Sequence, residues 1–293
     1  MALSIHTNYS SLITQTNLSK TNNALGTNQQ RLGTGLRINS AADDAAGLQI
    51  ATRLNAQSRG MEVAMRNTGD ATSLLQTAEG AFNEMTDIVQ RMKDLATQAS
   101  NDTNSTDDRT ALSAEYNELG KELANIMTNT KYAGETLFGV TATAGKFGAA
   151  GGMTFQIGSS STETLTLNVT AKMGTLVGAL TALNTQFAAV PASDAKLTTQ
   201  AGASGAITLA ETALNQIGSL RADFGANINR LNHTANNLAN MKDNTDMSKG
   251  RIVDADFAKE SANMSKNSML MQSGISMLKQ AGQMPGMVMS LLG

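Results

Sequence analysis

Histidine and cysteine, the side chains most often used for catalysis and metal binding, are nearly absent from this sequence. It contains His6 and His233, far apart and each among polar neighbours, and no cysteine. A zinc centre or an activated nucleophile requires several such groups that converge on one point. The chain also lacks the HExxH, GxSxG and Walker sequences, and Gly33-Thr34-Gly35 is not followed by a third glycine at the dinucleotide-binding spacing. We therefore interpret both histidines as surface residues.

Two short acidic stretches are the remaining candidates for chemistry. Asp43-Asp44 and Asp254-Ala255-Asp256 could supply carboxylate ligands to a hard cation. The same residue type also caps helices and complements the positive end of the helix dipole, and we favour that role here. Residues 140–202 contain neither histidine nor cysteine, so the middle of the chain offers no other centre. The sequence predicts no catalytic residue, no metal and no cofactor, and thus a protein that is not an enzyme.

The composition favours long helices and a core of small and aliphatic side chains. The 293 residues are 41% hydrophobic but only 3% aromatic, with two prolines and no tryptophan. We expect a core of Ala, Leu, Ile and Met rather than an aromatic-lined ligand pocket. A net charge of −2 argues against a nucleic-acid partner, and the lack of a long apolar run argues against a membrane span. The first residues lack the basic and apolar regions of a secretory signal peptide.

Two separated blocks carry heptad patterns typical of coiled-coil helices. Between Ser73 and Gln98 the apolar residues recur at steps of three and four: Leu75, Ala78, Phe82, Met85, Val89, Met92 and Ala96. A loop at 101–106 leads to a second helix, which Thr106 would cap. That helix carries Leu112, Tyr116, Leu119, Leu123 and Ile126. We expect it to pack antiparallel on the first.

The second block is a single helix from about residue 205 to 247, which would span roughly 60 Å. Its seam is Ile207, Ala210, Leu214, Ile217, Arg221, Phe224, Ile228, Leu231, Ala235 and Leu238. Arg221 is the one charged residue in this row. Two interpretations stay open: its stem packs while its head reaches water, or it pairs across the bundle and fixes the register.

The middle of the chain changes character. Residues 153–157 and 165–169 alternate between polar and apolar types and predict a β-hairpin. Residues 172–202 are rich in Ala, Thr and Gly, with a short apolar stripe from Leu176 to Val190 that Pro191 would end. We interpret this stripe as local packing, and we expect removal of residues 172–200 to be tolerated.

Both chain ends are helical but have no seam partner within either block. Leu18, Leu25 and Leu32 repeat every seven residues near the N-terminus. Near the C-terminus the same spacing relates Leu270, Met277, Met284 and Leu291, with Leu278 and Leu292 beside them. A terminal helix of this kind has nothing to bury its stripe against when it is alone. The two ends therefore predict a pair that becomes ordered within an assembly.

Long motifs at both ends resemble those of bacterial flagellins. At the N-terminal end these are Gln30–Ala51, which reads QRLGTGLRINSAADDAAGLQIA, then RNTGD at 66–70 and QTAEGA at 76–81. At the C-terminal end they are GRIVDA at 250–255 and the last ten residues, MPGMVMSLLG. The resemblance covers about residues 1–140 and 203–293.

The resemblance implies a mainly α protein, in which long antiparallel helices form a coiled-coil rod with a small β-hairpin element, beside a core domain of paired terminal helices. The expected domains are the two halves of the filament-core domain at 1–42 and 253–293, the N-terminal part of the rod at 43–171 and its C-terminal helix at 203–252. Residues 172–202 would be a reduced variable outer segment.

The function that the resemblance implies is structural. Family members polymerise into the extracellular flagellar filament used for motility and leave the cell through the flagellum's own type III apparatus. A flagellar export chaperone at the C-terminal segment, the filament cap and the hook-junction proteins are the implied partners. The assembly interface would comprise Leu18, Leu25, Leu32, Leu270, Met277, Leu278, Met284, Leu291 and Leu292.

A second implied role is recognition by host flagellin receptors. The residues that match the family's receptor site on the rod are Gln90, Arg91, Leu95, Gln98 and Glu115. A flagellar hook-filament junction protein shares the terminal helices and is the main alternative. The unbroken NSAADDAAG and QTAEGA stretches favour a flagellin.

Overall fold

The structure, a computed structural model, describes residues 8–141, 143–184 and 196–292, with side chains described as far as residue 283. The chain forms two compact units. One comprises residues 1–58 and 243–293, and the other comprises residues 59–242. Among the described residues, none of the helices combines the length and the apolar content that a membrane crossing requires. His6 lies outside the described part, and His233 is exposed.

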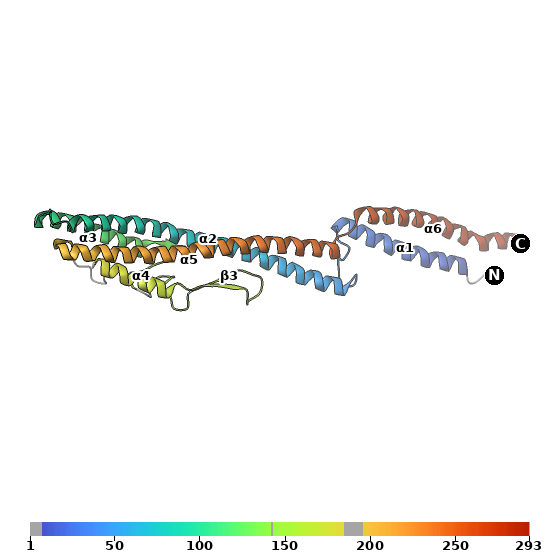
Figure 1. Cartoon of the computed structure of the whole chain (residues 1–293). Helices are drawn as coiled ribbons and strands as arrows, with labels where there is room; N and C mark the ends of the chain where they lie inside the picture. The colour runs from blue at the N-terminus through green and yellow to red at the C-terminus, as the bar shows by residue number, and fades with distance from the viewer. Residues whose placement is uncertain (1–7, 142, 185–195, 293) are drawn as a thin grey trace. The chain divides into compact units, whose positions relative to one another are not determined.

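Long helices build the unit at 59–242. α2 (Ala45–Ala99) and α5 (Gln200–Val253) each contribute residues to both units, and α3 (Thr106–Asn129) and α4 (Thr170–Leu183) pack beside them in this one (Figure 1). The predicted heptad seams occupy the core: Leu75, Ala78, Phe82, Met85, Val89 and Met92 are fully buried. Each helix buries one stripe and exposes the rest, as the three-four spacing predicts.

The start of α3 differs by one residue from the prediction. Ser105, not Thr106, is the N-cap, and its hydroxyl accepts a hydrogen bond from the Asp108 amide. The Asp108 carboxylate accepts from the Ser105 hydroxyl and amide in return, which completes a capping box. These bonds, the hydroxyl's first, hold the pKa of Asp108 below its usual range because they favour the charged form.

Four phenylalanine rings lie at the centre of this core, which otherwise consists mainly of Ala, Leu and Met, as expected. Phe82 packs on Phe138 at 4.9 Å and on Phe224 at 5.5 Å between ring centroids, and Phe147 contacts both partners. Phe138 and Phe147 come from irregular chain after α3, where no heptad pattern marks them. Four of the seven phenylalanines are thus concentrated in one place rather than spread over a pocket.

Two antiparallel hairpins precede α4. β3 (Met153–Gln156) pairs with β4 (Thr164–Leu167), with Met153 opposite Leu167, which confirms the predicted hairpin. β1 (Lys131–Tyr132) and β2 (Glu135–Thr136) form a shorter hairpin that no alternating pattern in the sequence predicts. Its two turn residues, Ala133 and Gly134, both have positive φ (50° and 86°), which is the turn geometry that matches strand twist.

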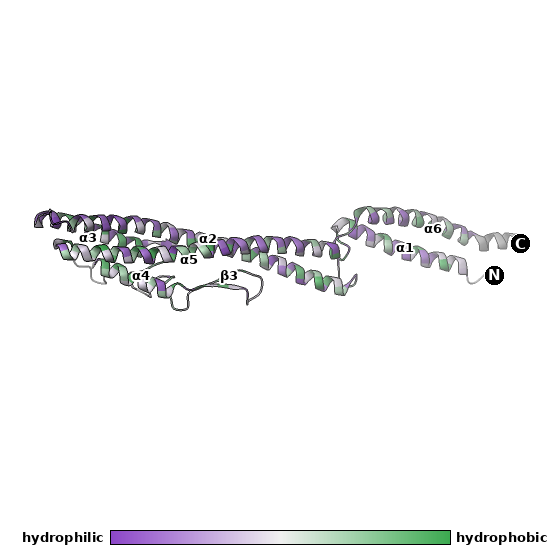
Figure 2. Ribbon diagram, in the orientation of Figure 1, coloured by the Kyte–Doolittle hydropathy of each residue, from purple (hydrophilic) through white to green (hydrophobic). Residues whose placement is uncertain are grey.

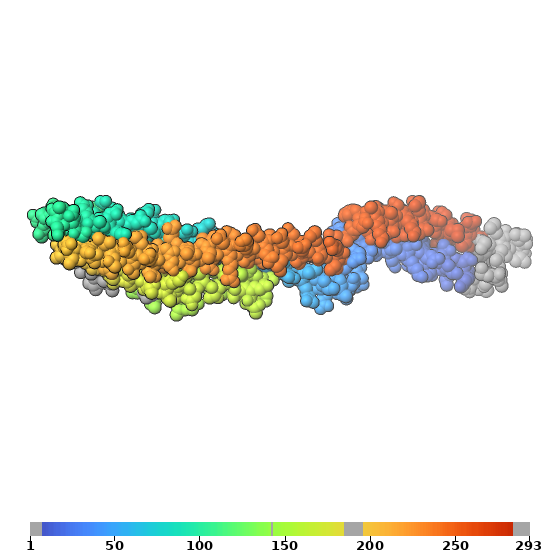
Figure 3. Space-filling model, viewed as in Figure 1, coloured from blue at the N-terminus to red at the C-terminus, as the bar shows by residue number. Residues whose placement is uncertain are grey.

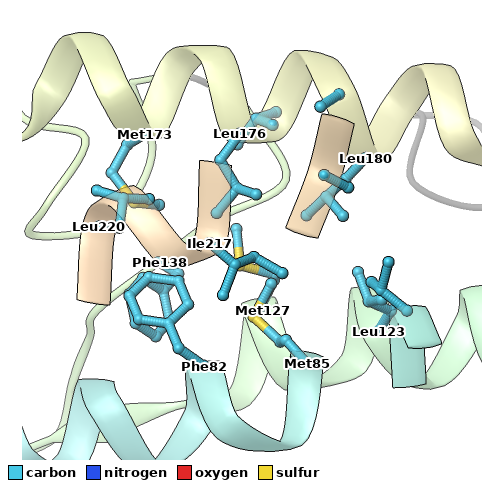
Figure 4. Close-up of a cluster of buried hydrophobic side chains, with 14 of the residues drawn as sticks. Phe82, Met85, Leu123, Met127, Phe138, Met173, Leu176, Leu180, Ile217 and Leu220 are labelled. Carbon is cyan, nitrogen blue, oxygen red and sulfur yellow. The ribbon is translucent and has the colours of Figure 1, made fainter. Parts of the chain in front are cut away.

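α4 is part of the main core, so the interpretation of residues 172–202 as a segment with only local packing is wrong. Met173, Leu176 and Leu180 are at most 1% exposed. Figure 4 shows their side chains directed at Ile217 and Leu220 of α5 and at the cluster around Phe82. The Lys172 ammonium also lies 2.5 Å from the Asp223 carboxylate of α5. The stripe that looked local is one side of a four-helix contact.

The end of α4 is fixed by α3 and by the short 3-10 turn η2 (Lys196–Thr198). The Tyr116 hydroxyl donates to the Leu183 carbonyl at 2.8 Å, and the Lys196 ammonium donates to the carbonyls of Ala182 and Leu183. Asn184 caps the helix and is 2% exposed. α4 therefore ends at Leu183, well before the predicted stop at Pro191, which lies outside the described residues together with Phe187 and Val190.

Asn184 fits into this corner because α3 has a glycine opposite it. A Cβ on Gly120 would overlap the Asn184 amide group, so the absence of a side chain there allows the contact. The Asn184 amide also donates to the Tyr116 carbonyl at 3.4 Å. α3 thus holds the last turn of α4 by shape and by hydrogen bonds.

Arg221 pairs across the bundle, as one of the two open interpretations had it. Its Nη2 atom lies 3.9 Å from the Glu79 carboxylate of α2, and both side chains are about one-third exposed, at 35% and 36%. An ion pair this long and this exposed adds little stability.

Candidate assembly interface

The unit formed by the two chain ends is built on one antiparallel helix pair. α1 (Tyr9–Thr34) lies against α6 (Phe257–Leu292) over the part of the pair whose side chains the structure describes (Figure 3). The Asn8 amide donates to the Ala281 carbonyl at 2.6 Å, and at the other end Arg31 lies 3.3 Å from Glu260. These two contacts join the start of one helix to the far end of the other, so the helices are antiparallel.

Local signals in the sequence set the ends of this pair. The Asn8 side chain caps α1 by accepting from the Ser11 amide, and Gly35 ends it with a φ of 73°. The Asp256 carboxylate accepts from the amides of Ala258 and Lys259 and so caps α6. Asp256, one of the acidic residues considered as a metal ligand, is therefore a helix cap.

Small and polar residues alternate with large apolar ones in the seam between α1 and α6. Leu18 lines a groove with Met271 and Ile275, and Leu25 lines another with Met264 and Met269. A Cβ on Gly274 would lie 3.2 Å from Leu18 Cδ1, so the leucine sits over the glycine. Most of the half-buried or buried residues of α6 are spaced by three and four, with Asn263 and Ser268 beside this row: Glu260, Met264, Asn267, Met271, Gly274, Leu278 and Ala281. This is a two-helix heptad seam.

Many large apolar side chains on the same helices remain exposed. Their exposed fractions run from 43% to 65%: Tyr9, Leu12, Ile13, Phe257, Met269, Leu270, Ile275 and Met277. Figure 2 shows hydrophobic residues recurring along both helices, so the apolar content is greater than one seam can cover. Monomeric proteins rarely expose apolar side chains in such density unless the surface binds a partner.

A backbone clasp connects the loop after α1 to the chain just before α6. The Gly35 carbonyl accepts from the Ala255 amide at 2.9 Å, and the Arg37 amide donates to the Val253 carbonyl at 2.6 Å. The Arg37 guanidinium donates to the Ile252 carbonyl at 2.8 Å. The two terminal segments are thus tied together by bonds that do not depend on their side chains in the seam.

The loop that follows the clasp contains Asp43 and Asp44, the other acidic residues considered as metal ligands. The Asp43 carboxylate accepts from the amides of Asn39 and Ser40 and from the Ser40 hydroxyl, and these bonds, the Ser40 amide's first, hold its pKa below the usual range. Asp44 accepts from the Gly47 amide at the start of α2. Both carboxylates therefore stabilise backbone turns. No group of three potential ligands suited to a metal occurs among the described residues.

Known proteins resemble this chain over its whole length. The family profile of the bacterial flagellin N-terminal helical region matches residues 5–143, and that of the bacterial flagellin C-terminal helical region matches residues 207–292. Polar flagellin C of Vibrio parahaemolyticus and flagellin A of Vibrio anguillarum are each 36% identical to it, with all of both chains covered. The chain belongs to the bacterial flagellin family. It is a structural subunit of the extracellular flagellar filament and not an enzyme.

A solved structure shares the fold of this flagellin at lower identity. A proposed flagellar hook-associated protein from Vibrio parahaemolyticus gives a TM-score of 0.57 at 16% identity, over 72% of this chain and all of that one. Such a likeness concerns the fold alone. The full-length relatives at 36% identity are flagellins, and they decide between the flagellin and the hook-junction alternative.

The residues predicted for the assembly interface fall on two different faces of the terminal pair. Leu18, Leu25, Leu32 and Leu278 are half-buried. Leu270 and Met277, the first two members of the predicted C-terminal row, are 48% and 58% exposed. Each residue of a helix is turned by about 100° from the one before it. The neighbouring row, with Met271 and Leu278, therefore faces α1 within one chain. Met284, Leu291 and Leu292 lie outside the described side chains.

The residues predicted as a receptor site lie on α2 and α3 of the rod. Arg91 donates to the Glu115 carboxylate through Nη2 at 2.6 Å and through Nε at 2.9 Å, and both side chains are about half exposed. Gln90 and Gln98 are exposed on the same helix as Arg91. Leu95 is only 1% exposed and belongs to the rod core, so its side chain is not presented to a partner in this structure.

Proposed function

We propose that the apolar side chains exposed on α1 and α6 form the surface through which this flagellin subunit contacts its neighbours in the filament. The observation that carries the proposal is the number of large apolar residues left uncovered by the single seam between these helices. A helix pair buries one stripe of each helix, and the remaining apolar area is covered only when further helices pack around it. Neighbouring copies of the same pair are the natural source of those helices.

Leu270 and Met277 provide the test because they are exposed within one chain. Changing both to Asp leaves the α1 contact of Leu278 in place but puts charges where apolar contact is expected. Burial of an unpaired charge costs at least about 3 kcal/mol, which raises the critical concentration for polymerisation more than about 100-fold. Seeded polymerisation followed by sedimentation and electron microscopy measures this concentration.

Gln272→Asp is the matched control, since Gln272 is an exposed polar residue on the same helix. We expect this variant to polymerise close to normally, because it adds a negative charge at a position that is already polar and removes no apolar area. Polymerisation of the Leu270→Asp/Met277→Asp variant at the wild-type critical concentration would contradict the proposal.

We propose further that the export chaperone, the filament cap and the hook-junction proteins bind the same terminal pair. The support is again the uncovered apolar face of α6, which needs a cover whenever the filament does not provide one. Calorimetric titration of the chaperone with the full chain tests this for one partner. The Leu270→Asp/Met277→Asp variant is expected to bind at least about tenfold more weakly than Gln272→Asp. Equal affinities of the two variants for the chaperone would show that the chaperone does not contact this face.

A receptor site on the rod is a second proposal, supported by the exposed Arg91–Glu115 pair. Two Arg91 nitrogens donate to one Glu115 oxygen, Oε1, which holds a guanidinium and a carboxylate at fixed positions on the surface, and Gln90 and Gln98 are exposed on the same helix as Arg91. Loss of Arg91 from a receptor contact would reduce signalling in a flagellin-receptor reporter assay by about tenfold or more. Arg66→Ala is the control, because Arg66 is an exposed rod arginine whose partner, Glu62, lies one helical turn away. A loss of the same size in both variants would show that the effect is not specific to the pair.

A further inference from the structure

The seam between α1 and α6 contains a layer of buried polar residues near one end. Asn28 and Glu260 are each 7% exposed. Arg31 lies 3.3 Å from the Glu260 carboxylate, and their side chains are 28% and 9% exposed. Oriented so that its donors meet acceptors, the Asn28 amide accepts from the Met264 amide at 3.2 Å and from the Asn267 side chain at 3.3 Å. The other large seam residues are Leu and Met, so this layer is chemically distinct.

Hydrogen bonding within the layer is incomplete. Among the described residues, Arg31 Nε and Glu260 Oε2 are buried atoms for which the structure contains no partner. A buried ion pair of this kind recovers its desolvation cost poorly, and well-packed apolar residues in its place are often as stable or more stable. Stability alone therefore does not account for the layer.

The apolar part of the seam does not define a unique alignment of the two helices. Leu18, Leu25 and Leu32 repeat every seven residues on α1, and Met264, Met271 and Leu278 do so on α6. Sliding α6 by one heptad places Leu25 over Gly274 where Leu18 now sits. Large residues then still face small ones. The apolar rows thus allow at least two alignments of similar packing.

We infer that the layer of Asn28, Arg31 and Glu260 selects the register of α1 against α6. A shift of seven residues separates Glu260 from Arg31 and removes the bonds of Asn28 to Met264 and Asn267, at no gain in apolar contact. A single polar position is known to fix register in this way in coiled coils. The wrong alignment is penalised because it leaves the buried polar groups without partners.

Register matters for the filament because it places the exposed apolar residues. A shift of seven residues moves α6 by about 10 Å along α1. Leu270 and Met277 would then lie at a different height relative to Tyr9 and Leu12. Subunits in mixed registers would present different surfaces, and a helical lattice needs one surface.

Cysteine cross-linking reports the register directly, since the natural chain has no cysteine. Filaments carrying Leu18→Cys with Gly274→Cys test the observed alignment, and Leu25→Cys with Gly274→Cys test the slipped one. A short thiol cross-linker followed by non-reducing electrophoresis separates intrachain loops from interchain dimers. In the natural background we expect the first pair to react and the second to stay unreacted.

The decisive background is Arg31→Leu with Glu260→Leu, which leaves the residues of the backbone clasp unchanged. A slipped α6 has to break the clasp bonds, because Ala255 lies only two residues before α6. We expect helix content to be retained while the slipped cross-link rises by at least about tenfold, the ratio that ~1.4 kcal/mol of discrimination provides. The exchanged pair, Arg31→Glu with Glu260→Arg, should restore the single register. Glu62→Leu with Arg66→Leu, an exposed ion pair of the rod, should leave it unchanged.

A Leu18–Gly274 cross-link that stays exclusive in the Arg31→Leu/Glu260→Leu background would overturn the inference. The clasp would then be sufficient to set the register. If that background does not polymerise, the same two cysteine pairs are read in the exchanged background and in Glu260→Gln, which keeps the side-chain shape. In that case two results together would also overturn the inference. The register would stay unchanged in Glu260→Gln, and it would slip in the exchanged background.

Discussion

Leu176 offers the sharpest test of whether α4 belongs to the rod. Its side chain is fully buried against α5 and the phenylalanine cluster (Figure 4). Leu176→Ala removes three carbon atoms from this contact, which costs ~2.4 kcal/mol in transfer free energy. The remaining cavity adds ~1 kcal/mol, because the four helices around it relax only partly. We expect a loss of about 3–4 kcal/mol in the free energy of unfolding.

Urea and thermal unfolding followed by circular dichroism measure this loss. For a folded unit of this size, 3 kcal/mol lowers the melting temperature by roughly 6–12 °C. Gly178 is the matched control, because it is an exposed residue of the same helix and a Cβ there would meet nothing within 4 Å. Gly178→Ala should raise stability by ~0.5–1 kcal/mol through helix propensity.

Unfolding of both variants at the wild-type midpoint would refute this reasoning. Leu176 would then belong to a helix that unfolds separately from the rod, and its burial would contribute nothing to the cooperative transition. A fall for Leu176→Ala combined with a rise for Gly178→Ala shows that both faces of α4 report on the same folding unit.

Three further outcomes follow from the same packing and capping. Gly120→Ala should lower the free energy of unfolding by ~1–3 kcal/mol, because its new methyl group overlaps the buried Asn184 amide at the end of α4. Gly80→Ala, on an open helix surface, should raise the free energy of unfolding, and urea unfolding compares the two variants. Hydrogen bonds from the capping serine hold the folded-state pKa of Asp108 below its unfolded value, so its cap is fully stabilising above pH ~4 and is lost as the pH falls through the folded pKa. Amide exchange at the start of α3 should rise as the pH falls through that folded pKa, and Asp108→Asn should remove this pH dependence. Deletion of residues 172–184 should abolish cooperative melting of the rod, whereas replacement of residues 185–195 by a short glycine linker should preserve it, as circular dichroism would detect.

Heptad spacing was the most reliable predictor of structure in this chain. Every residue of the seam from Leu75 to Ala96 is at most 1% exposed, because the long helices bury one stripe wherever partners are available on that side. The same rule placed the two terminal helices as a pair. It was less accurate at α4, where a short apolar stripe gave no indication of how much structure it would contact. Local pattern gives the face of a helix but not the number of its neighbours.

Other features had no periodic signal to reveal them. Phe138 and Phe147 reach the core from irregular segments, so their burial depends on how the chain returns to the rod. Asn28 and Glu260 look like ordinary surface residues in the sequence, and only the alignment of α1 with α6 shows that they are buried. Leu95 illustrates the opposite case, since a resemblance marked it as a surface contact but it is 1% exposed in the rod core.

The boundary between matched and unmatched sequence is not a boundary between core and appendage. Residues 144–206 lie between the two family profiles, yet Leu165, Leu176 and Leu180 within them are at most 1% exposed in the rod core. The relatives align over more positions than this chain has residues, so they carry additional sequence. Additional residues reduce stability least where the two backbone positions that flank them are already held close together. The Lys196 ammonium bonds to the Leu183 carbonyl at 3.3 Å and closes the chain in that way, so added length between these two residues leaves every described core contact intact.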